Sequence, residues 1–171
     1  MITVVTGGAS GIGRAIVDLI IARGEIAIAL DANSEAIDAL IAESGEAGDR
    51  LRATTADVTD EASLAAALDA SLRPGETIDA LVNSAGIGST LSFFETDAAS
   101  FRKILDVNLV GTFLASRAAI DRMNPEVGGA IVHLASVSGV RGNWGRTAYG
   151  ASKGGVITLT RVMAVELADL G

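Results

Sequence analysis

Residues 6–13 read Thr-Gly-Gly-Ala-Ser-Gly-Ile-Gly and join a short apolar run to a segment with helical periodicity. The preceding run, residues 2–5, is rich in β-branched residues and suits a buried strand. The apolar residues that follow recur at the spacing of one helical face: Ile12, Ala15, Ile16, Leu19 and Ile20. The glycines therefore lie on a strand-to-helix turn, where unpaired N–H groups and the positive end of the helix dipole favour a phosphate.

Three glycines of this turn have an expected role. Gly7 adopts a turn that a Cβ would forbid, Gly11 lets the backbone approach a pyrophosphate, and Gly13 lets the helix pack close to the strand. Taken alone, three such glycines also fit a plain tight turn. The rest of the chain must distinguish a nucleotide site from that simpler turn.

The composition limits the class of protein. With 171 residues, of which 49% are hydrophobic, the chain can bury one substantial core, so we expect a single domain over residues 1–171. The formal net charge of −8 argues against nucleic acid and anionic membranes as partners. The lack of cysteine excludes disulfides and thiolate metal sites, and we expect no metal. The first residues lack a basic region and no apolar run approaches a membrane span, which favours a cytoplasmic protein.

Strand and helix patterns alternate along the chain. The expected strands cover residues 2–5, 26–30, 51–56, 78–82 and 130–134. Gly24 closes the first helix, Asn33 or Ser34 caps the second, and Thr59 or Asp60 caps the third. A long helix is expected over residues 97–123 and a last one from about residue 149 to 169. The alternation predicts an α/β fold of the Rossmann type, a doubly wound parallel sheet of at least five strands in the order 3-2-1-4-5.

Polar residues stand where the expected strands end. The glycine turn follows the first strand, and Asp31, Asp57, Asn83 and Ser136 follow the others. Each residue alone could form a turn. In doubly wound sheets, however, ligands bind outside the carboxyl ends of the strands, so these positions at one edge of one sheet predict a binding site.

Asp31 bears on the choice of cofactor. It lies 18 positions after Gly13, close to the offset at which a carboxylate meets the adenosine ribose hydroxyls. The alternative is an Asp that caps a helix. A carboxylate repels a 2′-phosphate, and neither Ser10 nor Ala32 supplies a cation, so the sequence predicts NAD rather than NADP. Arg14 either reaches the pyrophosphate or is a solvated surface charge.

Tyr149 and Lys153 stand four positions apart at the start of the last helix. Such a pair shares one helical face, so the phenol and the ammonium lie close together. A neighbouring cation stabilises a phenolate, and a tyrosine of that kind can exchange a proton with an alcohol or ketone oxygen. The pair is weak evidence alone, because Tyr and Lys at this spacing are common on helices.

Asn108 interrupts the apolar face of the long helix. That face consists of Phe101, Ile104, Leu105, Leu109, Phe113 and Ile120. A buried amide without partners is costly, so Asn108 must bond another group or a water. The alternative is an Asn whose bonds are satisfied within the core.

These motifs together resemble the short-chain dehydrogenase/reductase family in its ordinary single-domain form. Residues 6–13 match its TGxxxGxG, residues 83–86 its NNAG with Ser in place of the second Asn, and Tyr149–Lys153 its YxxxK. Ser136, 13 positions before Tyr149, and Asn108, within Val-Asn-Leu-Val-Gly, stand where the family keeps its active-site Ser and Asn. The resemblance spans nearly the whole chain.

The resemblance implies a role for each matched residue. Tyr149 would be the general acid/base, Lys153 would hold the nicotinamide ribose, Ser136 would bond the reacting oxygen, and Asn108 would hold a water in a relay to Lys153. Asp57 would meet the adenine, and Asn83 the adenosine end. The implied cofactor-binding residues are Gly7, Ser10, Gly11, Ile12, Gly13, Asp31, Asp57, Val58, Asn83, Ala85, Gly86, Tyr149 and Lys153. Ser138 is the nearest competitor for the serine role, and His133 is interpreted as structural.

The leading interpretation is an NAD-dependent oxidoreductase that interconverts a secondary alcohol and a ketone. The extended epimerase/dehydratase branch shares YxxxK, but its usual TGxxGxxG spacing differs from residues 6–13. A catalytically impaired fragment and a non-enzymatic dinucleotide-binding protein are two rival interpretations. Intact Tyr149, Lys153, Ser136 and Asn108 argue against the non-enzymatic protein.

The substrate is left open by the sequence. Residues 137–148 are expected to border the pocket, with Trp144 between Arg141 and Arg146. The two arginines either admit an anionic or polyhydroxy substrate or are solvated loop charges.

Two further expectations concern assembly and the end of the chain. Leu114, Ala115 and Ala118 widen the apolar face of the long helix. Relatives pair this helix and the last one into a four-helix bundle, so we expect a homodimer or homotetramer.

Gly171 is expected to close the last helix. Relatives continue into a sixth strand, a substrate-covering segment and a seventh strand, so we expect a truncated dehydrogenase that turns over poorly unless a partner supplies the missing strands.

Overall fold

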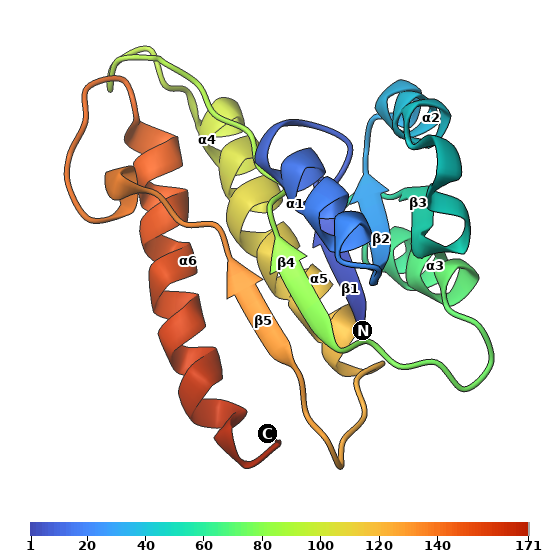
Figure 1. Cartoon of the computed structure of the whole chain (residues 1–171). Coiled ribbons are helices and arrows are strands. Elements are labelled where there is room, and N and C mark those ends of the chain that lie inside the picture. The colour runs from blue at the N-terminus through green and yellow to red at the C-terminus, as the bar shows by residue number, and fades with distance from the viewer. Residues whose placement is uncertain (171) are drawn as a thin grey trace.

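The computed structural model describes residues 1–170, without the side chain of Glu46, and Gly171 and its expected capping role lie outside the described residues. Five parallel strands form one sheet in the order β3-β2-β1-β4-β5, which confirms the predicted order (Figure 1). The strands are β1 (Ile2–Thr6), β2 (Ile26–Asp31), β3 (Leu51–Thr55), β4 (Ala80–Asn83) and β5 (Ala130–His133).

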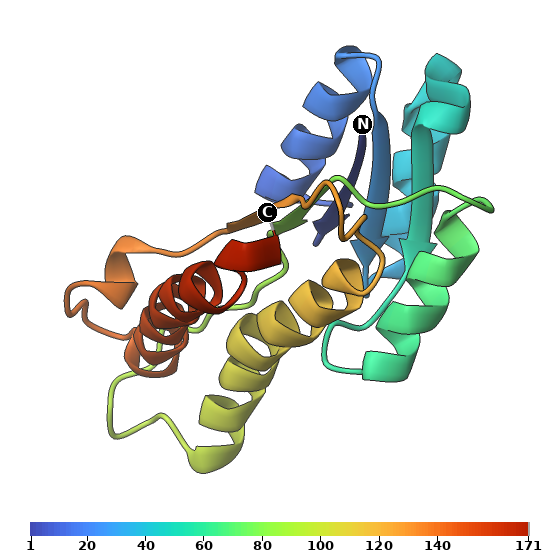
Figure 2. The same cartoon turned by 90° about the horizontal axis from the view of Figure 1, so that it is seen from below.

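Helices cover both faces of the sheet (Figure 2). They are α1 (Gly11–Ala22), α2 (Ser34–Glu43), α3 (Glu61–Ser71), α4 (Ala98–Leu105), α5 (Gly111–Ile120) and α6 (Thr147–Glu166). Helices α1 and α2 lie on one face, and α3, α4, α5 and α6 lie on the other. No helix among residues 1–170 is long and apolar enough to cross a membrane.

The alternation of side chains along the strands builds a core on each face. Val5 packs with Val17 and Leu40 on the α1–α2 face. Its neighbour Val4 points the other way and packs with Leu64 on the face that α3 and α5 cover. Both valines are almost fully buried, as expected for a central strand of a doubly wound sheet.

The predicted element ends differ from the structure by one to three residues. The third and fifth strands end one residue earlier than expected, at Thr55 and His133. The fourth begins at Ala80, because Ile78 forms only an isolated bridge, with Met123. The last helix begins at Thr147, two residues earlier than predicted.

The open choices among the helix caps are settled by hydrogen bonds. Asn33 caps α2 by accepting a bond from Ala36 N, and Asp60 caps α3 by accepting bonds from Ala62 N and Ser63 N. Helix α1 ends before Gly24, whose φ of 79° is a left-handed conformation that suits glycine.

The expected long helix over residues 97–123 is continuous from Ala98 to Ile120 but contains a wide turn. Residues Asp106–Val110, between α4 and α5, form a π-helical turn centred on Asn108. Turns of this kind are rare and occur frequently at functional sites. The apolar face expected from the sequence does not continue past this turn: Phe113 is exposed, while Thr112 and Ser116 are buried.

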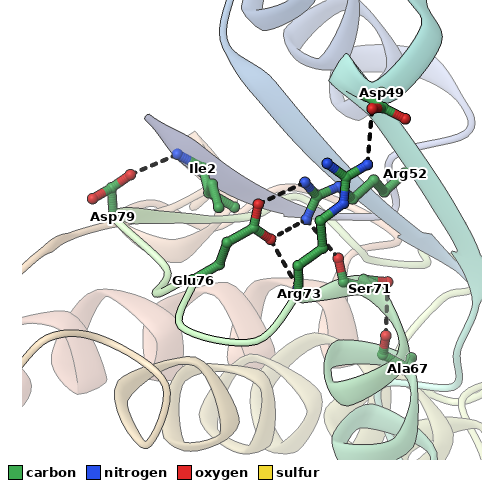
Figure 3. Close-up of polar contacts among 8 residues, drawn as sticks. All are labelled: Ile2, Asp49, Arg52, Ala67, Ser71, Arg73, Glu76 and Asp79. Atoms are coloured by element: carbon green, nitrogen blue, oxygen red, sulfur yellow. Dashed lines mark hydrogen bonds and ion pairs between the residues drawn. The ribbon is translucent and has the colours of Figure 1, made fainter.

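An ion-pair network holds the amino ends of the strands (Figure 3). Arg52 Nη2 donates to Glu76 Oε1 over 2.9 Å, Arg52 Nη1 donates to Ser71 O over 2.8 Å, and Arg73 N donates to Glu76 Oε2 over 2.8 Å. The bonds from Arg52, and next the Arg73 N–H, lower the pKa of Glu76 to about 2. The network lies at the end of the sheet opposite the strand ends that carry the predicted site.

Candidate active site

A cleft of about 1100 Å³ lies at the carboxyl ends of the strands. Its walls contain most of the predicted site residues: Gly7, Ser10, Gly11, Ile12, Asp31, Asp57, Val58, Ala85, Gly86, Tyr149 and Lys153. Four predicted residues are not part of the wall: Gly13, Asn83, Asn108 and Ser136. The first three of these are buried beneath it.

The glycine turn is built as the residue types require. Gly7 has φ of 65°, and a Cβ there would come within 2.8 Å of the Ala85 backbone. A Cβ on Gly13 would lie 2.1 Å from Gly7 O, so the turn closes only around a glycine. Gly11 also has a positive φ, of 53°, and its exposed side meets nothing within 4 Å. Gly7 and Gly13 thus allow the close backbone contacts of the turn, while Gly11 keeps the space at the cleft open.

Asp31 ends β2 and projects its carboxylate at the cleft wall. Its Oδ2 accepts a bond from Ala9 N over 3.2 Å, and its Oδ1 accepts one from Asn33 N over 3.1 Å. The helix-cap interpretation of Asp31 does not hold, since Asn33 caps α2 instead. The two backbone bonds fix the carboxylate and leave each oxygen a lone pair for a ligand.

Asp57 and Asn83 use their side chains differently. Asp57 Oδ1 accepts bonds from Thr59 N over 2.9 Å and Thr59 Oγ1 over 2.8 Å, which holds the loop beside the cleft. Asn83 turns its amide into the core, where its Nδ2 donates to Ser116 Oγ over 3.0 Å. The expected contact of Asn83 with a cofactor therefore does not come from its side chain in this structure.

Arg14 is a surface charge. Its Nε lies 3.0 Å from Asp18 Oδ1 and its Nη1 lies 3.1 Å from Glu43 Oε2. The hydrogen bonds that the guanidinium donates to Asp18 and then to Glu43 raise its pKa. Of the two interpretations of Arg14, the structure favours the surface charge over a contact with the pyrophosphate.

Tyr149 and Lys153 lie one turn apart on α6 and both line the cleft. Lys153 Nζ is 5.9 Å from the centre of the Tyr149 ring and donates to Leu134 O over 2.6 Å. Only 6% of Lys153 is exposed, and this burial lowers its pKa. The end of β5 thus anchors the ammonium beside the phenol.

Ser136 begins a 3-10 turn, Val137–Gly139, that packs on α6. Its Oγ accepts a bond from Ser138 N over 3.1 Å. The hydroxyl of its competitor Ser138 accepts a bond from Asn143 Nδ2 over 2.9 Å. A Cβ on Gly139 would meet the Lys153 backbone at 2.7 Å, so this glycine lets the turn approach the helix that carries Tyr149 and Lys153.

Asn108 is fully buried, and its amide bonds Ile87 in the loop after β4 and Ser152 on α6. Its Oδ1 accepts a bond from Ile87 N over 2.8 Å, while its Nδ2 donates to Ile87 O over 2.9 Å and to Ser152 Oγ over 3.0 Å. Both N–H groups of the amide are therefore used within the protein. A water held by Asn108 in a proton relay would therefore have to donate to an oxygen atom of Asn108.

His133 is hydrogen-bonded between α5 and α6, which agrees with the structural interpretation. Its Nε2 is 3.2 Å from Ser116 Oγ, and its Nδ1 is 2.9 Å from Thr160 Oγ1. Burial, and then the charge of Lys153, lower the pKa of His133. The imidazole therefore favours its neutral form, with hydroxyls on both sides to bond it.

Sequence reasoning missed two groups at the site: Ser152, which bonds Asn108, and the Leu134 carbonyl, which holds Lys153. Arg146, one of the two arginines expected near the pocket, lies over the Tyr149 ring. Ser152 could have been found from the sequence, because Ala148, Ser152 and Val156 recur at a spacing of four, the pattern of one helical face. All three are buried in the structure. The Leu134 carbonyl could not have been found, because every residue has a backbone carbonyl and residue type does not show which one bonds Lys153.

The chain is similar to known dehydrogenases. The family model of short chain dehydrogenase matches residues 1–171. A 2-dehydro-3-deoxy-L-rhamnonate dehydrogenase (NAD(+)) from Sphingomonas sp. (strain SKA58) is 40% identical over 169 residues, 98% of this chain and 66% of that protein. A D-threitol dehydrogenase from Mycolicibacterium smegmatis is 40% identical over 172 residues, 99% of this chain and 65% of that protein.

A solved structure extends the likeness to the fold. Levodione reductase superposes with a TM-score of 0.91 at 35% identity, covering 99% of this chain and 67% of that one. The chain thus spans about two thirds of the length of the relatives it matches. By its motifs, its sheet and a family match over its whole length, the chain belongs to the short chain dehydrogenase family.

Proposed function

We propose that the protein is an NAD-dependent oxidoreductase that interconverts a secondary alcohol and a ketone. The observation that carries the proposal is the position of Tyr149 and Lys153, side by side in the wall of the same cleft as the glycine turn and Asp31. A dinucleotide-binding protein without catalysis needs the turn and the carboxylate, but it needs neither the tyrosine nor a buried lysine.

The cleft fits a dinucleotide. Gly11 leaves open space where a Cβ would stand, and the N-terminus of α1 opens toward the turn. Asp31 would accept bonds from the adenosine ribose, and its charge opposes a 2′-phosphate, which supports NAD over NADP. When bound, the nicotinamide ring supplies or accepts the hydride.

The residues of the chain would hold the substrate and move its proton. Tyr149 would give a proton to the ketone oxygen in reduction, or take it from the alcohol in oxidation. Lys153, anchored by Leu134 O, would favour the phenolate by its charge and bond the nicotinamide ribose. Ser136 would bond the reacting oxygen, and Asn108 would support the relay that returns the proton to Lys153.

The names of the relatives leave the substrate class open, since one denotes a sugar acid and the other a neutral tetritol. A panel of ketones with NADH and NADPH, and of polyols and hydroxy acids with NAD and NADP, followed at the nicotinamide absorbance, tests the proposal. Turnover that prefers NAD supports it. Dinucleotide binding without turnover of any panel member would favour a catalytically impaired or non-enzymatic protein.

We also propose a homodimer or homotetramer, located in the cytoplasm. Val110 and Phe113 on the long helix, and Val162 and Val165 on α6, are large apolar side chains left exposed. Self-association through these helices would cover them. Light scattering at micromolar concentration tests the assembly, and a monomer there would contradict it.

A further inference from the structure

Arg146 places its guanidinium beside the ring of Tyr149. The Arg146 Cζ lies 5.6 Å from the ring centre, on the wall of the cleft that both residues line. Its Nη1 donates to Ser89 O over 3.2 Å. A cation therefore stands next to the phenol at the substrate end of the cleft, in addition to Lys153.

The backbone of Arg146 is held in place by the loop that follows β4 (Figure 1). Leu91 pairs with Arg146 in a parallel bridge, and Leu91 N donates to Gly145 O over 3.2 Å. A Cβ on Gly88 would lie 3.5 Å from both Arg146 Nη1 and Tyr149 Cδ2. The guanidinium and the phenol ring thus meet at Gly88, and their relative position is fixed by the fold.

The charge of Arg146 has no acidic partner in the described part of the chain. Ion pairs with carboxylates are formed instead by Arg14, Arg52, Arg73 and Arg122. Arg146 is half-buried, and the single bond to Ser89 O leaves most of its five N–H donors for another acceptor. A planar guanidinium with such donors matches a carboxylate, which it binds through two parallel hydrogen bonds.

We propose that Arg146 binds a carboxylate of the substrate, so that the enzyme acts on hydroxy acids and their oxo acids. This inference rests on the proposed function and names the substrate class of that site. In the reaction, an oxo acid, NADH and a proton give the hydroxy acid and NAD, while the carboxylate is unchanged. Arg146 thereby selects the substrate and fixes which end of it faces Tyr149.

Arg141 provides a matched control. It lies five positions earlier in the same loop, is exposed, and is not part of the cleft wall. The inference therefore requires a loss at Arg146 and none at Arg141. Of the two roles that the sequence left open for these arginines, it assigns the substrate contact to Arg146 and the solvated charge to Arg141.

The test uses acetoacetate, 4-oxopentanoate and 5-oxohexanoate, each paired with its neutral methyl ester. Binding to the protein with NAD, which cannot reduce a ketone, is measured by calorimetry, and turnover with NADH by loss of the NADH absorbance. We expect at least one acid to bind about tenfold or more tightly than its ester, as a charged hydrogen-bonded pair allows. Arg146→Ala should abolish that preference, Arg146→Lys should keep part of it, and Arg141→Ala should keep all of it.

Several results would overturn the inference. Equal binding of acid and ester throughout the series would do so, and so would an acid preference that survives in Arg146→Ala. An equal fall of kcat for acids and esters in Arg146→Ala, with KM unchanged, would show that Arg146 only positions Tyr149.

The two proposals fail separately. Turnover of acids and esters alike, lost in Tyr149→Phe, would leave the proposed function standing without the inference. Conversely, an acid preference in binding that depends on Arg146, without NADH oxidation, would leave the inference standing and reject the proposed function.

Discussion

The amide of Asn108 donates a 3.0 Å hydrogen bond to the hydroxyl of Ser152, joining the π turn to the helix of Tyr149. Ser152 is fully buried, and its hydroxyl donates in turn to Tyr149 O over 2.8 Å. One hydroxyl therefore links the backbone of Tyr149 to an amide that also holds Ile87, in the loop that follows β4 and lines the cleft.

This link predicts a stability defect in Ser152→Ala. The change leaves one buried N–H of Asn108 without its partner, which costs about 1–3 kcal/mol of unfolding free energy. Urea denaturation of the two proteins measures the difference. Thr158→Ala, at an exposed position of the same helix, is the control and should stay within about 0.5 kcal/mol of the unmutated protein. Equal stability of Ser152→Ala and the control would show that the bond contributes nothing.

Asp31 predicts the cofactor preference. Its carboxylate is held at the cleft wall by Ala9 N and Asn33 N, so its charge cannot move away from a 2′-phosphate without breaking these bonds. We expect the unmutated protein to bind NAD more tightly than NADP, and Asp31→Ala to relax that preference. Calorimetric titration with both cofactors measures it, with the exposed Asp38→Ala as control. Equal affinities in the unmutated protein would reject the assignment.

Tyr149→Phe tests the proton transfer. The ring and its packing against Gly88 remain, while the hydroxyl that we propose exchanges the proton is deleted. Turnover should fall by about 10²- to 10⁴-fold, the usual share of general acid–base catalysis, while NAD binding persists. Steady-state rates and a binding titration on the same preparation separate the two effects. Near-normal turnover of the variant would mean that another group carries the proton.

The features that could be predicted from the sequence are those set by local spacing. The glycine turn, the polar strand ends and the Tyr149–Lys153 pair each follow from residues a few positions apart. The features that could not be predicted depend on distant contacts. The bonds of Asn83 to Ser116, of Asn108 to Ser152 and of Arg146 to Ser89 join residues 33, 44 and 57 positions apart.

Asn83 illustrates the limit. Its place after a strand correctly put it at the carboxyl edge of the sheet, but residue type could not say whether the amide faces the cleft or the core. The hydroxyl of Ser116, on a helix that packs beneath β4, supplies the partner that draws the amide inward. For Asn83, the direction of the amide is therefore decided by a residue 33 positions away in the sequence.

The Arg52–Glu76 pair predicts how stability depends on pH. Glu76 has its pKa lowered from 4.5 to about 2, so the folded state favours the carboxylate more than the unfolded state does. The contribution of this group is therefore complete above about pH 4.5 and is lost as the pH falls toward about 2. We expect Glu76→Gln to be less stable than the unmutated protein at pH 7, and the difference to shrink steadily between pH 5 and pH 2. Chemical denaturation across this range measures it, with the exposed Glu166→Gln as a control that shows no such trend. A difference that stays constant down to pH 2 would mean that the effect of the mutation comes from packing rather than from the charge of Glu76.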